Sequence, residues 1–172
     1  MEFNNIRIRK GHPNDIKSIA EIKVVGWQSA YEGIIDNVYL DSMSVTEQIK
    51  VTKNYPLDTI FVAEDGNEIL GFCRFYDYDK PVYEDKDIDC EIREIYVKPD
   101  IKRQGIGSRL FLYTMNYFQQ KGKKKLYLGC FKDNLNARKF YDKMGGCAQA
   151  GKDMKISGNM YPTVSYTFIL CD

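Results

Sequence analysis

The segment IYVKPDIKRQGIGSRL, residues 95–110, sets a basic, glycine-bearing turn between a strand-like and a helix-like stretch. Alternating apolar and polar residues at its start predict a strand end, which Pro99 stops because it has no N–H to donate. An apolar stripe after Gly107 predicts a helix. The first N–H groups of a helix lack partners and carry the positive end of its dipole, and Gly105 and Gly107 let a ligand approach the backbone. The segment therefore predicts an anion-binding site.

The glycine spacing excludes two common phosphate-binding loops. A dinucleotide fingerprint has a third glycine where Leu110 stands, and a Walker loop has Gly-Lys-Ser/Thr where this chain has Gly-Ser-Arg. The turn resembles instead the Q/R-x-x-G-x-G/A loop of the GNAT N-acetyltransferases, which binds the pyrophosphate of acetyl-CoA. Here the loop reads Lys102-x-x-Gly105-x-Gly107. Lys102 departs from the pattern, because lysine keeps the charge but lacks a planar fork.

A second stretch, DNLNARKFYDKMGG at residues 133–146, resembles the other GNAT signature, N-x-x-A-x-x-F-Y-x-K-x-G. The same spacing also fits an ordinary amphipathic helix with Phe140 in the core. Two motifs in the family order are more specific than either one, and the resemblance covers most of the chain from Ile6 onward. The matching positions are Asn134, Ala137, Phe140, Tyr141, Lys143 and Gly145.

The resemblance implies an α/β (α+β) fold with a mixed, mostly antiparallel central sheet flanked by helices. Two parallel strands, here Cys90–Lys98 and Leu126–Phe131, would splay apart, and acetyl-CoA would lie between them as co-substrate without any metal. The main chain at 95–97 would bind the pantetheine arm and the thioester oxygen. The implied cofactor-binding residues are Ile95, Tyr96, Val97, Lys102, Arg103, Gln104, Gly105, Ile106, Gly107, Ser108, Asn134 and Ala137.

Acetyl transfer to an amine needs a base and an acid. A primary amine like that of lysine has a pKa of about 10.4 in water, so a carboxylate must remove a proton, directly or through water. Glu91 and Glu94 are the candidates, and their spacing predicts opposite faces of the strand. We favour Glu91, which matches a catalytic Glu of several family members, although an ordinary sheet-surface carboxylate is the alternative for each. Tyr141 matches the family's general acid, and its alternative is a core aromatic. Asn134 would contact pantetheine or cap its helix.

The acceptor is less well defined by the sequence. Trp27 and Tyr31 resemble the wall of the acceptor pocket in small-molecule GNAT enzymes, although their i, i+4 spacing also fits a helix face packed on the core. Residues 1–90 carry a net charge of −7 and residues 91–172 of +8, with six acids between Asp77 and Asp89. These acids are either a solvated loop or an attraction for a cationic acceptor. We therefore predict a polyamine-like, aminoglycoside-like or peptide amine, with protein N-terminal or lysine acetylation as the alternative.

Composition limits the other function classes. The 172 residues predict one domain, 1–172, and the 44% hydrophobic and 28% charged fractions are typical of a soluble globular protein. Five cysteines without a CxxC pair predict reduced thiols in the cytoplasm, and His12 as the single histidine excludes a His-rich metal site. No signal peptide or membrane span is expected. A catalytically silent acyl-CoA-binding module is disfavoured by Tyr141 and Glu91, and nucleic-acid binding by the isolation of the basic run Lys121–Lys125. Monomer and homodimer are both compatible with the sequence.

The elements that must position these residues are predicted by the periodicity of the chain, which alternates between strand-like and helix-like stretches. The expected strands are Ile6–Lys10, Thr59–Glu64, Ile69–Tyr76, Cys90–Lys98, Leu126–Phe131, Cys147–Lys155 and Val164–Leu170, the second and third forming a hairpin and the last two a closing pair. The expected helices run toward Ala30, from Ile35 to Lys53, over Ser108–Gln120 and from Asn134 onward.

Overall fold

The computed structural model describes residues 5–80, 82–85 and 87–170. Its helices are α1 (Ile16–Tyr31), α2 (Asn37–Ser42), α3 (Val45–Thr52), α4 (Ile106–Gln120) and α5 (Leu135–Lys143). Its strands are β1 (Arg7–Lys10), β2 (Ile60–Asp65), β3 (Glu68–Asp77), β4 (Ile88–Val97), β5 (Lys125–Phe131), β6 (Cys147–Ala150), β7 (Met154–Ile156), β8 (Asn159–Tyr161) and β9 (Thr163–Ile169). None of the helices in these ranges is long and apolar enough to cross a membrane.

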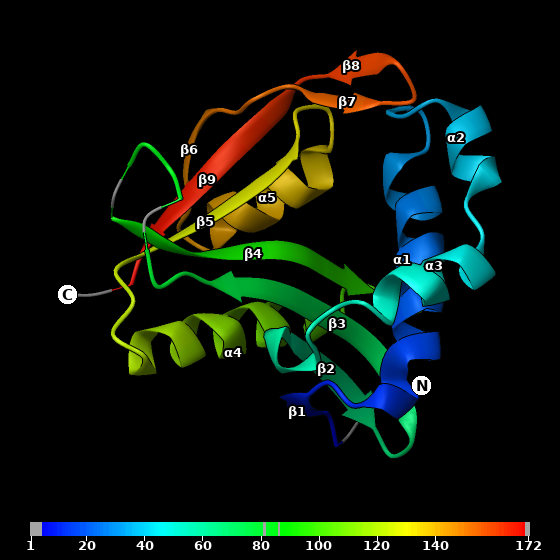
Figure 1. Cartoon of the computed structure of the whole chain (residues 1–172), viewed down its shortest axis with the longest axis horizontal. Helices are drawn as coiled ribbons and strands as arrows, with labels where there is room; N and C mark the ends of the chain where they lie inside the picture. The colour runs from blue at the N-terminus through cyan, green and yellow to red at the C-terminus, as the bar shows by residue number, and fades with distance from the viewer. Residues whose placement is uncertain (1–4, 81, 86, 171–172) are drawn as a thin grey trace.

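A seven-stranded sheet with the order β1-β2-β3-β4-β5-β9-β6 forms the centre of the molecule (Figure 1). Its neighbours pair antiparallel except β4 and β5, which pair in parallel. The predicted hairpin between β2 and β3 is present, and helices flank the sheet. The mixed, mostly antiparallel fold class is therefore confirmed.

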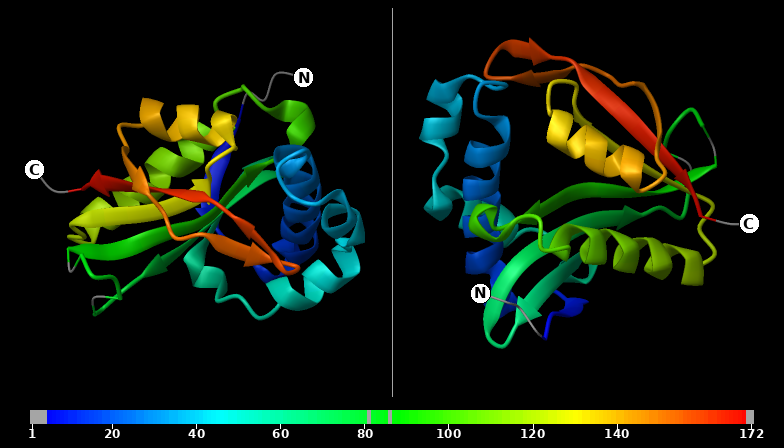
Figure 2. Two further views of the ribbon diagram at one scale, coloured as in Figure 1. Left: turned by 90° about the horizontal axis from the view of Figure 1, so that it is seen from above. Right: turned by 180° about the vertical axis from the view of Figure 1, so that it is seen from behind.

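The two faces of the sheet carry separate hydrophobic cores, because alternate residues of a strand point to opposite sides. On β2, Phe61 and Ala63 join the core beneath α4 and α5, whereas Ile60 and Val62 join the core beneath α1. The view from above shows α4 and α5 on one side of the sheet and α1 on the other (Figure 2). The sheet is thus the middle layer. A gap between two of its strands would therefore open toward the helices on both sides.

Such a gap exists between β4 and β5. The two strands pair only where Ile88, Cys90 and Glu91 face residues 125–127, although β4 continues to Val97 and β5 to Phe131. Beyond Glu91 the strands diverge, as the green and yellow ribbons show (Figure 1). The splay implied by the family resemblance is therefore present, and it leaves the facing backbone groups of both strands free for a ligand.

A β-bulge at Arg93 changes which face the candidate carboxylates occupy. Glu91 lies opposite Tyr76, and Glu94 lies opposite Arg74. Tyr76 and Arg74 are two residues apart on β3 and share a face, so Glu91 and Glu94 share that face as well. The prediction of opposite faces was wrong, because the bulge inserts one extra residue between the two glutamates.

Two predicted elements are divided. The helix expected from Ile35 to Lys53 is interrupted by extended residues Met43 and Ser44, which separate α2 from α3. The strand expected over Cys147–Lys155 ends as β6 at Ala150, and β7 pairs with β8 instead of β9. Ser157 and Gly158 connect β7 to β8 with φ of 46° and 88°, the left-handed pair that a two-residue hairpin turn needs.

Candidate active site

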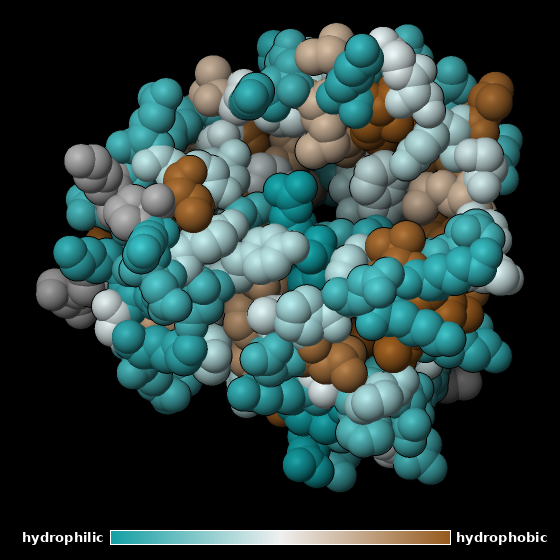
Figure 3. Space-filling view, viewed as in Figure 1, coloured by the Kyte–Doolittle hydropathy of each residue, from teal (hydrophilic) through white to brown (hydrophobic). Residues whose placement is uncertain are grey.

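A cavity of about 500 Å³ occupies the splay between β4 and β5. Its walls come from the diverging half of β4, residues 92–97, from the glycine turn and the start of α4, from α5, and from the end of α1. The space-filling view shows a hollow at the corresponding place, surrounded mainly by hydrophilic residues (Figure 3). The cavity therefore joins the two motifs that the sequence analysis singled out.

Most predicted cofactor residues line this cavity. They are Ile95, Tyr96, Val97, Lys102, Arg103, Gly105, Ile106, Gly107, Ser108, Asn134 and Ala137. Gln104 is not part of the lining. Among the other candidates, Glu94, Tyr141 and Tyr31 line the cavity, whereas Glu91 and Trp27 do not.

The two glycines of the turn have different physical roles. Gly105 has φ of 80°, a left-handed conformation that favours glycine, and it directly precedes α4. Gly107 needs no special conformation, and a Cβ there would meet only Val97 Cγ2 at 3.8 Å within the protein. The space beside Gly107 is thus left for a ligand, next to the first N–H groups of α4. This geometry can hold an anion.

The start of α5 is fixed by Asn134. Its side-chain oxygen Oδ1 accepts a hydrogen bond from the Ala137 N–H at 3.1 Å, so Asn134 caps the helix. The capping alternative for Asn134 is therefore confirmed, and the residue also lines the cavity.

Tyr141 projects from α5 into the cavity lining. Its side chain is 8% exposed and packs on the rings of Phe111, Phe140 and Tyr166. Burial raises the pKa of the Tyr141 hydroxyl above that of a free phenol. Within the described part of the chain this hydroxyl has no hydrogen-bond partner. Tyr141 is consequently a protonated donor at neutral pH whose proton is available to a ligand.

A pair of tyrosines forms the wall toward α1. The hydroxyls of Tyr31 and Tyr96 lie 2.9 Å apart, and burial raises the pKa of both. Gly26 permits this contact, because a Cβ there would lie 2.8 Å from the Tyr96 ring. Trp27 packs edge-on against Tyr31, 4.9 Å between ring centroids, behind the lining. Trp27 thus supports the wall from outside the cavity.

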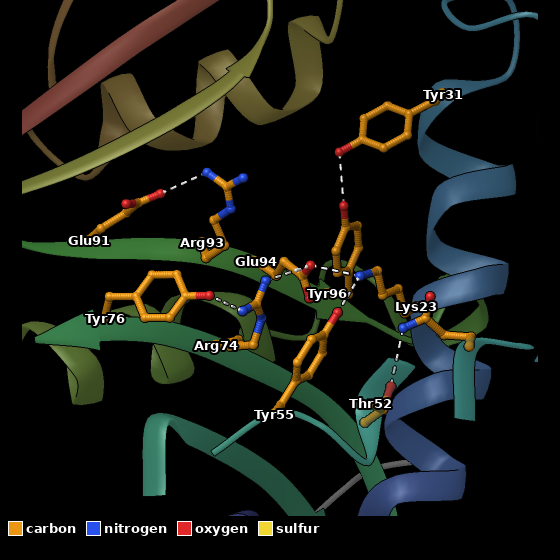
Figure 4. A network of polar contacts seen from close by, with 11 residues as sticks. Lys23, Tyr31, Thr52, Tyr55, Arg74, Tyr76, Glu91, Arg93, Glu94 and Tyr96 are labelled. Carbon is orange, nitrogen blue, oxygen red and sulfur yellow. Dashed lines mark hydrogen bonds and ion pairs between the residues drawn. The ribbon is translucent and has the colours of Figure 1, made fainter. Parts of the chain in front are cut away.

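Glu94 is a buried carboxylate with one free oxygen. Its Oε1 accepts hydrogen bonds from Lys23 Nζ at 2.7 Å and from Arg74 Nη2 at 3.1 Å (Figure 4). Its Oε2 is buried and has no partner among the described residues. Burial alone would raise the pKa of Glu94, but Lys23 and Arg74 lower it, and the net shift is downward. Glu94 is therefore ionised at neutral pH, with Oε2 able to accept a proton or a hydrogen bond.

The two cations around Glu94 are themselves held by tyrosines. Lys23 donates to the Tyr55 hydroxyl at 3.0 Å, and Arg74 donates to the Tyr76 hydroxyl at 2.6 Å. The Arg74 guanidinium also lies over the Tyr55 ring, 4.1 Å from its centroid. Such a network fixes Glu94 in one orientation.

Glu91 is saturated by donors. Its Oε2 accepts from the Tyr78 hydroxyl at 2.7 Å and the Tyr83 hydroxyl at 2.6 Å, and its Oε1 accepts from Arg93 Nη1 at 3.2 Å. Both tyrosines belong to the connection between β3 and β4. Glu91 consequently anchors that connection and orients Arg93.

Comparison with known proteins identifies the family. Residues 24–146 match the family model described as "Acetyltransferase (GNAT) family". The chain belongs to this family. It is 28% identical over 131 residues to the uncharacterized N-acetyltransferase YuaI of Bacillus subtilis, covering 75% of this chain and 73% of that protein. It is 26% identical over 144 residues to a spermidine N(1)-acetyltransferase of Thermoplasma acidophilum, covering 82% and 88%.

Solved structures show the same fold. The PaiA N-acetyltransferase of Thermoplasma acidophilum, crystallised in complex with coenzyme A, superposes with a TM-score of 0.70 at 20% identity, over 95% of this chain and 99% of that one. The yncA protein of Salmonella typhimurium, crystallised with its cofactor acetyl-CoA, superposes with a TM-score of 0.64 at 15% identity, over 97% of this chain and 95% of that one. The identification as a GNAT acetyltransferase is therefore confirmed by sequence and fold together.

The acids between Asp77 and Asp89 have partners in this acetyltransferase that the sequence did not suggest. Asp77 pairs with Lys121 and Lys123, and Asp85 with Lys125 at 2.8 Å. Asp89 accepts the backbone N–H groups of residues 124 and 125. The acidic segment and the run 121–125 thus offset each other. Three of the six acids, Asp77, Asp85 and Asp89, are therefore held by contacts within the protein, and the link between the acidic segment and a cationic acceptor stays a prediction.

Metal and disulfide chemistry find no support in the described ranges. Within them no group of three or more His, Cys, Asp or Glu residues could hold a metal ion. Cys73, Cys90, Cys130 and Cys147 are free thiols there, while Cys171 lies outside the described residues.

Several site residues of the acetyltransferase were not predicted. Arg93, Ser29 and Cys130 line the cavity, and Lys23 and Arg74 hold Glu94. Two signals could have found the last pair. Lys23 interrupts an apolar helix face and Arg74 interrupts an apolar strand, and a charge in such a position is buried only with a partner.

Proposed function

We propose that this enzyme transfers the acetyl group of acetyl-CoA to a primary amine inside the cavity between β4 and β5. One observation carries the proposal: the anion-binding turn and the buried tyrosine with a free hydroxyl line the same cavity. The residues fit the cofactor, because the open space at Gly107 beside the N–H groups of α4 suits a pyrophosphate. The two structural relatives crystallised with CoA or acetyl-CoA support this assignment.

The unpaired edge of β4 would bind the rest of the cofactor. Backbone groups at Ile95, Tyr96 and Val97 line the cavity beyond the point where β5 parts from β4. Those of them that do not bond to β3 are available to the amides of the pantetheine arm and to the thioester oxygen. An N–H aimed at that oxygen stabilises the negative charge that develops when the amine attacks.

Tyr141 is the proposed acid. The amine nitrogen bonds to the acetyl carbon, the carbon–sulfur bond breaks, and the departing thiolate takes the Tyr141 proton. The raised pKa of Tyr141 keeps its hydroxyl protonated at neutral pH, so the proton is present when the thiolate departs.

Glu94 is the proposed base. Its Oε2 is buried without a partner and the residue lines the cavity, so it can take a proton from the acceptor ammonium, directly or through water, and the neutral amine then attacks. The prediction that favoured Glu91 is not supported by its contacts, since both Glu91 oxygens accept from protein donors and the residue lies outside the lining. The pairing of Glu94 with Lys23 and Arg74 keeps it ionised, which a base requires.

The proposed acceptor is a primary amine of a small molecule. The relative named as a spermidine N(1)-acetyltransferase supports including polyamines. Aminoglycosides, lysine peptides and peptide N-termini remain acceptors to be tested. A silent acyl-CoA-binding module is disfavoured, because both proposed catalytic side chains line the cavity.

The test measures acetyl-CoA turnover as the release of free thiol, with a panel of primary amines that includes these classes and amino acids. We expect release that requires both the enzyme and one class of amine, and that is lost in Tyr141→Phe. Calorimetric binding of acetyl-CoA without thiol release for any amine would contradict transferase activity and support the binding module.

A further inference from the structure

The charges around the acceptor end of the cavity are not those of a site for a polycation. Outside the glycine turn, the charged residues in the described lining are Arg93 and Glu94. The charge of Glu94 is already offset by Lys23 and Arg74. Together with the Glu91–Arg93 pair, these residues form a cluster of three cations and two carboxylates. The members are Lys23, Arg74, Arg93, Glu91 and Glu94. A bound polyamine would therefore meet a net positive surrounding.

Arg93 is the accessible cation of this cluster. Its side chain is 52% exposed, whereas the Glu91 side chain that holds it is 5% exposed. Only Nη1 has a hydrogen-bond partner among the described residues, namely Glu91. The Nη2 and Nε donors are left for a ligand.

The orientation of Arg93 is built into the fold. As the bulged residue of β4, Arg93 is not held in the ladder with β3. Its anchor Glu91 is in turn clamped by Tyr78 and Tyr83. In the view of Figure 4, the guanidinium lies between Glu91 and the Tyr31–Tyr96 pair. Because Nη1 of the Arg93 guanidinium is held by Glu91, the remaining donors Nη2 and Nε are preorganised for a planar anion.

We propose that the acceptor carries a carboxylate near its amine and that Arg93 binds that carboxylate. The guanidinium matches a carboxylate through two parallel N–H donors, and the free Oε2 of Glu94 receives the ammonium end of the same molecule. An amine of the amino-acid type carries both of the groups that Arg93 and Glu94 would bind. This inference rests on the proposed function, because it narrows the acceptor of the same reaction.

The experiment compares amino acids with their own carboxamides, which keep the size and the amine but lose the negative charge, and it includes spermidine. The variants are Arg93→Gln and Arg93→Lys, with Arg7→Gln, an exposed arginine on β1, as the matched control. Acetyl-CoA affinity by calorimetry and thermal unfolding are measured for every variant. These readouts separate loss of acceptor recognition from loss of structure.

We expect the parent to prefer the acid over its amide by about ten- to a hundredfold in kcat/KM, the range for a hydrogen bond to a charged group. Arg93→Gln should abolish the preference with unchanged acetyl-CoA affinity. Arg93→Lys should retain part of it, because lysine keeps the charge but not the fork. Arg7→Gln should behave like the parent.

Two results would overturn the inference alone. The first is turnover of spermidine or of the amides at least as efficient as turnover of the acids. The second is an acid preference that survives in Arg93→Gln. If acetyl-CoA binds and no amine in the panel is acetylated, the proposed function fails and the inference fails with it.

Discussion

The cofactor end and the acceptor end of the cavity are built in opposite ways. The proposed cofactor end is formed by one segment, residues 102–108, which offers backbone N–H groups and the open space beside Gly107. The acceptor end uses side chains that are far apart in sequence, from Lys23 on α1 through Arg74 on β3 to Glu94 on β4. The proposed cofactor site is thus a local motif of the sequence, whereas the proposed acceptor site depends on a network that exists only after folding.

The largest effect is expected where the two ends meet, at Tyr141. Tyr141→Phe removes the proton donor and keeps the packed ring, so turnover should fall by about 10²–10⁴-fold, the usual size of general acid catalysis. Acetyl-CoA affinity by calorimetry should change little. A reduction of less than twofold at every pH would return Tyr141 to a purely structural role.

The acceptor network should fail as a unit when its central charge is removed. Glu94→Gln leaves Lys23 and Arg74 buried without their carboxylate, and breaking a buried pair from one side costs about 3–5 kcal/mol. We expect the free energy of unfolding, measured with denaturant, to fall by about 3 kcal/mol, the lower end of this range, because Gln can still accept hydrogen bonds. Glu47→Gln, which breaks an exposed pair with Lys50, is the control and should have almost no effect. Equal stability of the two variants would show that Glu94 is not the centre of the network.

The same network predicts a pH dependence. The pKa of Glu94 is lowered in the folded protein, so its stabilisation is fully present above the unfolded value of about 4.3 and is lost as pH falls through the folded value. As the pH falls from about 4.3 toward the folded pKa of Glu94, the free energy of unfolding should therefore decline more steeply in the parent than in Glu94→Gln. Parallel pH profiles for the two proteins would contradict the lowered pKa.

The cofactor end should respond to added volume instead of lost charge. Gly107→Val fills space that meets only Val97 Cγ2 within the protein, so the fold should persist while acetyl-CoA affinity falls by at least about tenfold, the cost of losing a charge-assisted contact. Gly105→Ala is the contrasting variant, because its left-handed φ makes the substitution costly for stability by about 1–2 kcal/mol. Unchanged calorimetric affinity in Gly107→Val would remove the turn from the cofactor site.

The smallest effect is expected at the acidic segment. Asp85 and Asp89 contact the run 121–125, away from the cavity lining. Changing both to Asn should leave KM for every acceptor unchanged at low and high salt. A salt-dependent increase in KM for cationic amines alone would restore the link between these acids and the acceptor.

The contrast between the two ends also explains what could be predicted. Gly105 and Gly107 could be interpreted because strand, turn and helix are contiguous. The bulge at Arg93 could not be predicted, because it depends on the pairing of β4 with β3. This bulge places Glu91 and Glu94 on one face of the sheet. The separate β7–β8 hairpin was missed although Ser157-Gly158 is a turn signal, because the flanking strands are short and mostly exposed.

The central claim is that the cofactor lies in the splay with its pyrophosphate on the α4 N-terminus. A crystal structure of the protein with coenzyme A tests it most directly. The account predicts pyrophosphate oxygens at the N–H groups of residues 105–108 and the thiol between β4 and β5 beside Tyr141. Coenzyme A bound elsewhere, or a thiol remote from Tyr141, would contradict it.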